Sequence, residues 1–260
     1  MKSPHILAIS SFAVHGTASL KTFITVLGEK ILPVPSLMLN GLTNMSLVKK
    51  FDPPFRELLQ GTFELAADRT LELILYIGYL GKAEQADIIL EMASVYRNQI
   101  KMIITDPVSG DHGKKYVPDE VIARWPDIIR RSDMVFPNQT ELKILTGNAP
   151  DANMENDALI EQFHKLYPET KLIITSIKTG DNAIGLSVTG DNPFIYSHNL
   201  LPKNYGGSGD LFLSLFILNH FYKNFSFDDA LRFAADQTYN IIKNSIEKGS
   251  DDLILEVNNN

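Results

Sequence analysis

The stretch Tyr205-Gly206-Gly207-Ser208-Gly209-Asp210 is followed directly by the apolar run 211–218, and the rest of the chain is interpreted around it. Glycines let backbone N–H groups converge without Cβ atoms between them, and a helix N-terminus adds partial positive charge. The stretch therefore predicts an anion-binding cup at the start of a buried helix. An acid at the rim of the cup would repel the anion. Its presence is explained if Asp210 takes a proton from a group that attacks a phosphate. The alternative is that Ser208 or Asp210 only caps the helix, and this stretch alone leaves both interpretations open.

Composition limits the classes of protein that fit. The chain has 260 residues, 44% hydrophobic and 21% charged, which is ordinary for a globular protein with a sizeable core. The net charge of −7 argues against a nucleic-acid or anionic-membrane surface, so a polyanionic substrate would need metal ions or backbone donors. The absence of cysteine excludes disulfides and cysteine-ligated metals. No apolar run is long enough to span a bilayer, so we expect a soluble chain. The lack of cysteine is compatible with the cytosol, and with the negative charge we expect a cytoplasmic protein with neither nucleic acid nor membrane as a partner.

Strand and helix patterns alternate along the sequence. Apolar runs predict strands at residues 5–10, 31–39, 71–77, 101–105, 134–136, 172–175, 183–188 and 193–197. Helical spacing predicts helices at 18–28, 53–67, 83–96, 118–130 and 156–167, one with Glu141 in its first turn, and two closing helices. This order predicts one α/β domain over residues 1–260, with a mostly parallel sheet covered on both faces and a small antiparallel pair.

Polar and glycine-rich positions gather where the predicted strands end. In open α/β sheets, ligands bind beyond the carboxyl ends of the parallel strands. Each position alone suits a turn or a helix cap, but six of them at one sheet edge predict a functional site. They are Ser10 with Ser11, residues 78–81, Asp106, Asn138 with Glu141, Thr175 with Ser176, and residues 206–210.

Asp106, Glu141 and Asp210 supply carboxylates to this predicted site, and no histidine follows a predicted strand. Hard oxygen ligands without imidazole favour Mg²⁺ over zinc. A Mg²⁺ site, a glycine-lined anion cup and a carboxylate base are the parts that phosphoryl transfer to a hydroxyl requires. The chain has no P-loop pattern, and it lacks the dinucleotide-binding glycine pattern after its first strand, which disfavours a dehydrogenase.

Four segments resemble motifs of pyridoxal kinases and of the wider ribokinase-like superfamily. Residues 106–117 (DPVSGDHGKKYV) resemble the loop Asp-Pro-Val-Met-Gly-Asp-x-Gly-Lys-x-Tyr-Val of pyridoxal kinases. Residues 78–85 (GYLGKAEQ) resemble their Gly-Tyr/Phe-Leu-Gly-Ser-x-Glu-Gln segment. Residues 136–147 (FPNQTELKILTG) are similar to their Thr-Pro-Asn-x-x-Glu-x-x-x-Leu-Thr-Gly. Residues 207–210 match the superfamily's Gly-Thr-Gly-Asp with serine for threonine.

The resemblance implies a ribokinase-like fold, usually as a homodimer. It also implies transfer of the ATP γ-phosphate to the 5′-hydroxyl of pyridoxal, pyridoxine or pyridoxamine. Asp210 would be the base and would contact the acceptor. Gly207, Ser208 and Gly209 would form the anion hole, next to the bound ATP.

The same resemblance implies roles for the other strand-end residues. Asp106 and Glu141 would organise Mg²⁺ and the ATP phosphates, directly or through water, with Asn138 supporting them. The loop 110–116 would close over the reacting groups. Thr175 and Ser176 would lie near the nucleotide phosphates, and Ser11, Thr43 and Tyr79 would hold the acceptor.

Two segments that line the acceptor pocket in this family depart from its pattern. The family usually has Leu-Ser-Asn-His-Thr where this chain has Leu39-Asn40-Gly41-Leu42-Thr43, and the first turn, residues 10–16, is atypical. A hydroxymethylpyrimidine kinase is the alternative enzyme: Leu-Lys-Thr-Phe at 20–23 favours it, and Asp210 disfavours it, because that family usually has cysteine there. A vitamin-binding pseudokinase is the alternative from another class. The altered segment at residues 39–43 favours this alternative, and the intact Asn138, Glu141 and Asp210 argue against it.

Overall fold

The computed structural model describes residues 3–43, 45–190 and 192–255. The strands are β1 (His5–Ala13), β2 (Ile31–Leu39), β3 (Lys50–Phe51), β4 (Leu73–Ile77), β5 (Ile100–Thr105), β6 (Gly110–Asp111), β7 (Lys114–Lys115), β8 (Met134–Val135), β9 (Lys171–Gly180), β10 (Ala183–Val188) and β11 (Phe194–Asn199). The α-helices are α1 (Leu20–Leu27), α2 (Phe55–Asp68), α3 (Glu84–Val95), α4 (Asp119–Ile122), α5 (Trp125–Ile129), α6 (Gln139–Leu145), α7 (Asn156–Leu166), α8 (Ser208–Ile217) and α9 (Phe227–Glu247).

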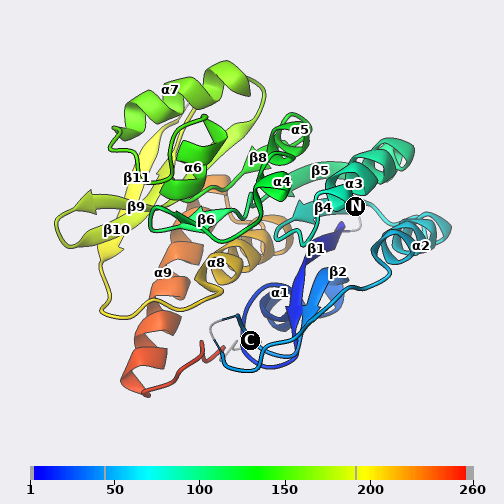
Figure 1. Cartoon of the computed structure of the whole chain (residues 1–260), viewed down its shortest axis with the longest axis horizontal. Helices are drawn as coiled ribbons and strands as arrows, with labels where there is room; N and C mark the ends of the chain where they lie inside the picture. The colour runs from blue at the N-terminus through cyan, green and yellow to red at the C-terminus, as the bar shows by residue number, and fades with distance from the viewer. Residues whose placement is uncertain (1–2, 44, 191, 256–260) are drawn as a thin grey trace.

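Nine of the described strands form one sheet, in the order β11-β10-β9-β8-β5-β4-β1-β2-β3. The six strands from β9 to β2 in that order pair in parallel, while β10, β11 and β3 pair antiparallel at the two edges (Figure 1). The mostly parallel sheet with a small antiparallel pair is thereby confirmed. The strands β6 and β7 form a separate hairpin.

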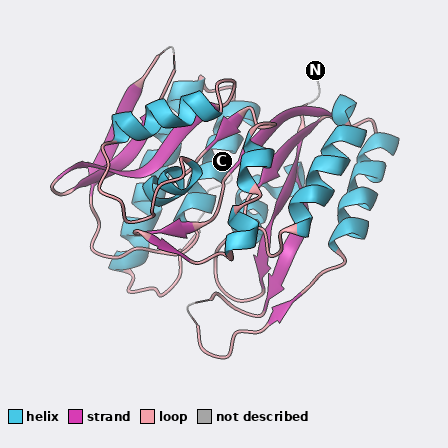
Figure 2. Cartoon of the chain, turned by 45° about the horizontal axis from the view of Figure 1, so that its top comes forward, coloured by secondary structure: helices cyan, strands magenta, loops and turns pink. Residues whose placement is uncertain are grey.

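Helices cover both faces of the sheet, as Figure 2 shows. One apolar layer packs α2, α3, α5 and α7 against the sheet, and the other packs α1, α8 and α9. All five residues of β4 are buried, because this central strand has a helix layer on each side. In the described ranges, no helix is both long and apolar enough to cross a membrane.

The structure differs from the predicted elements in five places. The strand predicted at 5–10 continues to Ala13, because residues 11–13 still pair with β2 after a register shift, so Ser10 and Ser11 lie inside β1 rather than after it. The short strand β3, which was not predicted, pairs with the end of β2. The strand predicted at 172–175 continues to Gly180, because β9 leaves its parallel partner β8 and goes on by pairing antiparallel with β10. The helix predicted at 118–130 is divided into α4 and α5, since Pro126 in the first turn of α5 has no N–H with which to continue the earlier helix. The hairpin β6–β7 lies where the sequence predicted only a loop.

Candidate active site

The N-terminus of α8 is packed closely against the loop that joins β1 to α1. Gly207, the residue before the helix, has φ +85°, and a Cβ there would lie 2.6 Å from the carbonyl oxygen of Thr17 and 2.8 Å from Cα of Ala18. Only glycine fits this contact without displacing the backbone. Gly206 and Gly209 face open space instead. The helix therefore begins at a fixed point on the sheet edge and leaves its first N–H groups available to an anion.

Asp210, in the first turn of α8, is held by this same loop. Its Oδ2 accepts a hydrogen bond from the backbone N–H of Ser19 at 2.8 Å, and Ser19 Oγ accepts one from Ser11 Oγ at 2.8 Å. Burial raises the pKa of Asp210 to about 6, and the bond from Ser19 acts in the opposite direction. The structure thus links the predicted base to Ser11, a predicted acceptor-binding residue, through one serine.

The sequence interpretation missed Ser19. A serine just before a helix normally indicates a cap, but the Ser19 side chain makes no capping bond to α1. Its backbone lies at φ 51° and ψ −135°, a conformation that strains any residue other than glycine. No pattern in a single sequence signals that strain or the long-range bond to Asp210.

Asp106 directly follows β5, and its backbone N–H extends the ladder to the carbonyl of Ile77 at 2.9 Å. Its carboxylate accepts no hydrogen bond from any residue that the structure describes. Burial raises the pKa of Asp106 well above its usual range, and the negative charges of Glu141 and Asp210 add to that rise. The side chain is therefore an open acid at the centre of the predicted site.

Asn138 and Glu141 form the predicted capping box at the start of α6. Asn138 Oδ1 accepts from the N–H of Glu141 at 3.0 Å, and Glu141 Oε2 accepts from the N–H of Asn138 at 2.9 Å. The same two side chains also hold the segment that leads into the hairpin. Glu141 Oε1 accepts from the N–H of Ser109 at 3.0 Å, and Asn138 Nδ2 donates to the carbonyl of Gly110 at 2.8 Å. The cap and the neighbouring loop are thus one structural unit.

The donor set fits a Mg²⁺ ion that arrives with a nucleotide. In the part of the chain that the structure describes, no group of three or more His, Cys, Asp or Glu side chains could hold a metal alone. Each oxygen of Glu141 already accepts a backbone N–H, which leaves Asp106 as the open ligand and Glu141 for a contact through water. Mg²⁺ is commonly held by one or two carboxylates together with substrate phosphates. A cation would also relieve the repulsion that raises the pKa of Asp106.

The predicted acceptor residues lie on the other side of Asp210. Ser10 Oγ accepts from the N–H of Tyr79 at 3.2 Å, and the half-buried Tyr79 ring packs in an apolar cluster with Leu39 and Leu42. Ser11 is buried, whereas Thr43 is exposed and makes no hydrogen bond with the described residues. The structure therefore brings Ser11 to Asp210 but leaves Thr43 in the outer loop.

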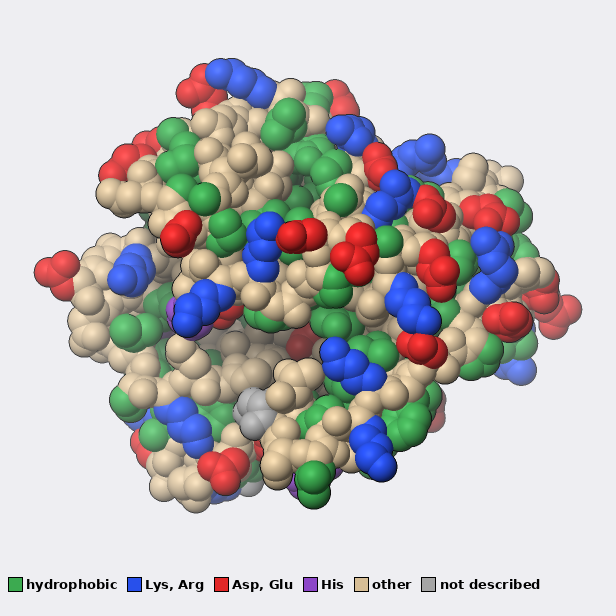
Figure 3. Space-filling view, in the orientation of Figure 1, with side chains coloured by type: hydrophobic (Ala, Val, Ile, Leu, Met, Phe, Trp, Pro, Cys, Tyr) green, Lys and Arg blue, Asp and Glu red, His purple; other side chains and the backbone are tan. Residues whose placement is uncertain are grey.

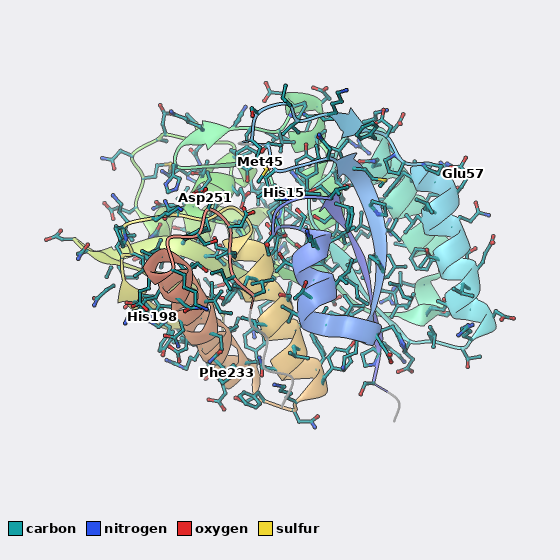
Figure 4. All side chains as sticks on the ribbon, turned by 90° about the horizontal axis from the view of Figure 1, so that it is seen from below. His15, Met45, Glu57, His198, Phe233 and Asp251 are labelled. Carbon is teal, nitrogen blue, oxygen red and sulfur yellow. The ribbon has the colours of Figure 1, made fainter. Side chains whose placement is uncertain are left out.

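The outer wall on this side consists of two loops that follow β1 and β2. The backbone N–H of His15 donates to the carbonyl of Asn40 at 3.2 Å, so the two loops lie side by side. Figure 4 shows His15 and Met45 together on these loops, away from His198 near α9. The surface is hollowed between the hairpin β6–β7 and α1, with acidic atoms at depth (Figure 3).

The prediction that Thr175 and Ser176 follow a strand is wrong, because both residues lie inside β9. Thr175 is nevertheless near the site: its N–H donates to the carbonyl of Pro137 at 2.9 Å, and it forms a parallel bridge with Asn138. Ser176 is exposed, with φ 54°. A separate cavity of about 520 Å³ lies at the opposite end of β9, far from Asp106 and Asp210, and is lined by residues that include His164, Lys171 and Ser226.

Comparisons with known proteins agree with this fold. The pyridoxal kinase of Dictyostelium discoideum is 28% identical over 237 residues, which cover 82% of this chain and 77% of that protein. A candidate phosphomethylpyrimidine kinase from Bacteroides thetaiotaomicron superposes with a TM-score of 0.86 at 23% identity, covering 98% of this chain and 92% of the other. A second crystal form of that protein contains pyridoxal. PdxK of Plasmodium falciparum, solved with AMP-PNP and PL, superposes with a TM-score of 0.83 at 20% identity, covering 99% and 94%.

These similarities confirm the resemblance to pyridoxal kinases and the ribokinase-like fold. A family model described as phosphomethylpyrimidine kinase matches residues 33–256, from β2 to beyond α9. The match includes the strand-end residues from Asp106 to Asp210 and most of the chain. The chain therefore belongs to the phosphomethylpyrimidine kinase family.

Proposed function

We propose that the protein is an ATP-dependent kinase that phosphorylates the 5′-hydroxyl of pyridoxal, pyridoxine or pyridoxamine. The observation that carries this proposal is the position of Asp210. It lies in the first turn of α8, is held by Ser19, and shares a sheet edge with the open acid Asp106. The similarity to the pyridoxal kinase of Dictyostelium discoideum supports it, as does the pyridoxal held by the similar Bacteroides protein.

In the proposed reaction, Asp210 accepts the proton of the acceptor hydroxyl as the hydroxyl oxygen attacks the γ-phosphorus. A new oxygen–phosphorus bond forms, the bond to the β-phosphate oxygen breaks, and ADP leaves with that electron pair. A base with a pKa of about 6 is ionised at neutral pH and remains basic enough to help remove the proton. The N–H groups that follow Gly207 stabilise the charge on the transferred phosphoryl group.

Asp106, Asn138 and Glu141 organise the nucleotide side of this reaction. Bound Mg²⁺ would neutralise the negative charge of the phosphates, and Asp106 is the side chain open to hold it. Asn138 and Glu141 position the backbone of Ser109 and Gly110 next to that acid. Thr175 lies beside Asn138 and completes this wall.

A hydroxymethylpyrimidine kinase is the second candidate, and the description of the matching family favours it. Both acceptors carry a hydroxymethyl group on a flat nitrogen-containing ring, so the same base and anion cup would serve either. The family resemblance further suggests a homodimer, which light scattering on the purified chain would test, and a cytoplasmic location.

The proposal is tested by incubating the purified chain with Mg²⁺, ATP and one acceptor at a time. ADP release and the mass of the product are measured for pyridoxal, pyridoxine, pyridoxamine and hydroxymethylpyrimidine. We expect an increase of one phosphate on the B6 vitamers and little turnover of the pyrimidine. Preferred turnover of the pyrimidine would establish the second candidate. No turnover of any acceptor by folded protein would refute both and favour a vitamin-binding pseudokinase.

A further inference from the structure

Tyr76 lies in the layer of the sheet directly below the candidate active site. In the strand register, Ala8 of β1 and Ile104 of β5 flank Tyr76 of β4 on either side. Side chains alternate between the faces of a sheet, so the next positions on the same face are two residues further along each strand. Those positions are Ser10, inside β1, together with Gly78 and Asp106, which directly follow β4 and β5.

The Tyr76 side chain reaches up into that terminal layer. Its ring is fully buried and stacks on Phe23 of α1, with ring centroids 4.3 Å apart. A Cβ built on Gly78 would lie 2.8 Å from the Tyr76 hydroxyl oxygen and 3.0 Å from Ser10 Oγ. The missing side chain at Gly78 therefore provides the space for the hydroxyl, and the Tyr76 and Ser10 oxygens are at most about 6 Å apart, which two hydrogen bonds through one water can span.

The Tyr76 hydroxyl is a buried donor that meets no hydrogen-bond partner among the described residues. Such a group costs stability unless it finds an acceptor, so its placement needs a reason. Asp106, in the adjacent column, is an acceptor with no donor. The charges of Asp106, Asp210 and Glu141 all act on the phenol, and burial together with these charges raises the pKa of Tyr76 well above its usual value. The hydroxyl therefore keeps its proton and is available to donate.

We propose that Tyr76 is a positioning residue for Asp106, to which its hydroxyl donates through one buried water that Ser10 also binds. Three polar partners are enough to hold such a water. The bridge fixes the carboxylate that faces the nucleotide and its metal ion, while the ring itself touches neither substrate. This inference rests on the proposed role of Asp106 in the kinase reaction.

Tyr76→Phe tests the inference, because it removes only the hydroxyl. Calorimetric titration with ADP is done with Mg²⁺ and again with a chelator, and the kinetic constants for ATP and pyridoxal are measured in parallel. Loss of a direct hydrogen bond to a charged group changes an equilibrium by roughly tenfold or more, and a bond that acts through a water is expected at or below the lower limit. We expect Tyr76→Phe to bind MgADP about five- to tenfold more weakly, with the Kd of metal-free ADP and the KM for pyridoxal within about twofold of wild type.

Tyr222→Phe is the matched control. Its hydroxyl donates to the carbonyl of Pro4 at 2.5 Å, so the variant also loses a phenol hydrogen bond, but away from the site. We expect it to bind MgADP normally. In an Asp106→Ala background, Tyr76→Phe should weaken MgADP binding by less than about a further twofold, because Tyr76 acts through Asp106.

Unchanged MgADP binding by Tyr76→Phe would overturn the inference. Equal weakening of both forms of ADP, with a loss of thermal stability, would overturn it too and assign the hydroxyl a purely structural role. If Tyr76→Phe weakened MgADP binding in the Asp106→Ala background as much as it does in the wild type, Tyr76 would not act through Asp106. These nucleotide titrations do not depend on which acceptor is phosphorylated, so the inference and the proposed acceptor can fail separately.

Discussion

Asp210→Asn should make the protein more stable while it abolishes most of the activity. The substitution keeps the size of the side chain, and the amide oxygen can still accept the hydrogen bond from Ser19. It removes a negative charge that is mostly shielded from water, and burial of that charge is what raises the pKa of Asp210 to about 6. Because the unfolded chain ionises the same group near 3.8, the folded state is penalised for carrying the charge.

The size and pH range of this effect follow from the two pKa values. Their difference corresponds to about 3 kcal/mol at pH values above 6. Part of the carboxylate is accessible, so solvent screening lowers this figure, and we expect roughly 1–3 kcal/mol. The folded-state pKa is the higher one, so Asp210 favours folding most below pH 4, and this contribution is lost as pH rises to about 6. The advantage of Asp210→Asn should therefore grow between about pH 4 and 6 and stay constant above that range.

The measurement compares urea unfolding of wild type and Asp210→Asn at pH 7.5 and 4.5, together with turnover at pH 7.5. We expect the stability advantage at pH 4.5 to be about one third of its value at pH 7.5. General-base catalysis contributes roughly 10²–10⁴-fold, so kcat should fall by about that factor. Asp68→Asn, at the exposed end of α2, is the control and should change neither quantity. A stability difference between Asp210→Asn and wild type that is the same at both pH values would refute the burial argument. Near-normal turnover by Asp210→Asn would refute the assignment of Asp210 as the base.

Three further substitutions test separate parts of the site. Gly207→Ala should destabilise the fold by more than about 2 kcal/mol and reduce turnover over a hundredfold, while Gly206→Ala, which faces open space, should do neither in the same melting and kinetic assays. Asn138→Ala should cost about 1–2 kcal/mol and raise the KM for ATP, since it removes both the cap of α6 and the bond to Gly110; an unchanged KM would show that the cap has only a structural role. Ser19→Gly should change stability by less than about 1 kcal/mol and leave kcat near wild type, because the relief of backbone strain offsets the loss of the hydrogen bond from Ser11 Oγ, and the N–H that holds Asp210 remains; a loss of more than about 2 kcal/mol would contradict the strain.

The sequence predicted those features that depend on local pattern. The continuous apolar run of β4 and the capping box of Asn138 and Glu141 both follow from neighbouring residues, and both are present in the structure. The extension of β9 to Gly180 depends instead on pairing with β10, a partner that the residues of β9 do not specify. The pattern-based prediction was therefore wrong where a second strand decides a boundary, and also at Pro126, which divides a helix that the pattern predicted as continuous.

The site itself shows the same limit. Asp106 is recognisable because it follows an apolar run, and Asp210 because it lies between a glycine-rich stretch and an apolar run. Ser19 and Tyr76 could not be found, since one acts through a strained backbone N–H and the other is a buried aromatic residue inside a strand, which usually indicates core. Only the three-dimensional register places Tyr76 beneath Gly78 and beside Ile104, two residues before Asp106.

The two halves of the site are also built differently, and this determines where acceptor specificity can change. The nucleotide half is fixed by helix caps and strand ends, such as the bonds between Glu141 and Asn138. The outer wall of the acceptor half is formed by the loops that follow β1 and β2, which contact each other through the hydrogen bond from His15 to Asn40. Leu42 lies on Gly16, where a Cβ would come within 2.7 Å of Leu42 Cδ1. Leu42 is the residue that stands in place of the histidine of the family motif compared with residues 39–43. A change in this pair of loops would alter the acceptor without disturbing Asp210, so exchanges at Leu42 should shift the KM among acceptors and leave the KM for ATP unchanged.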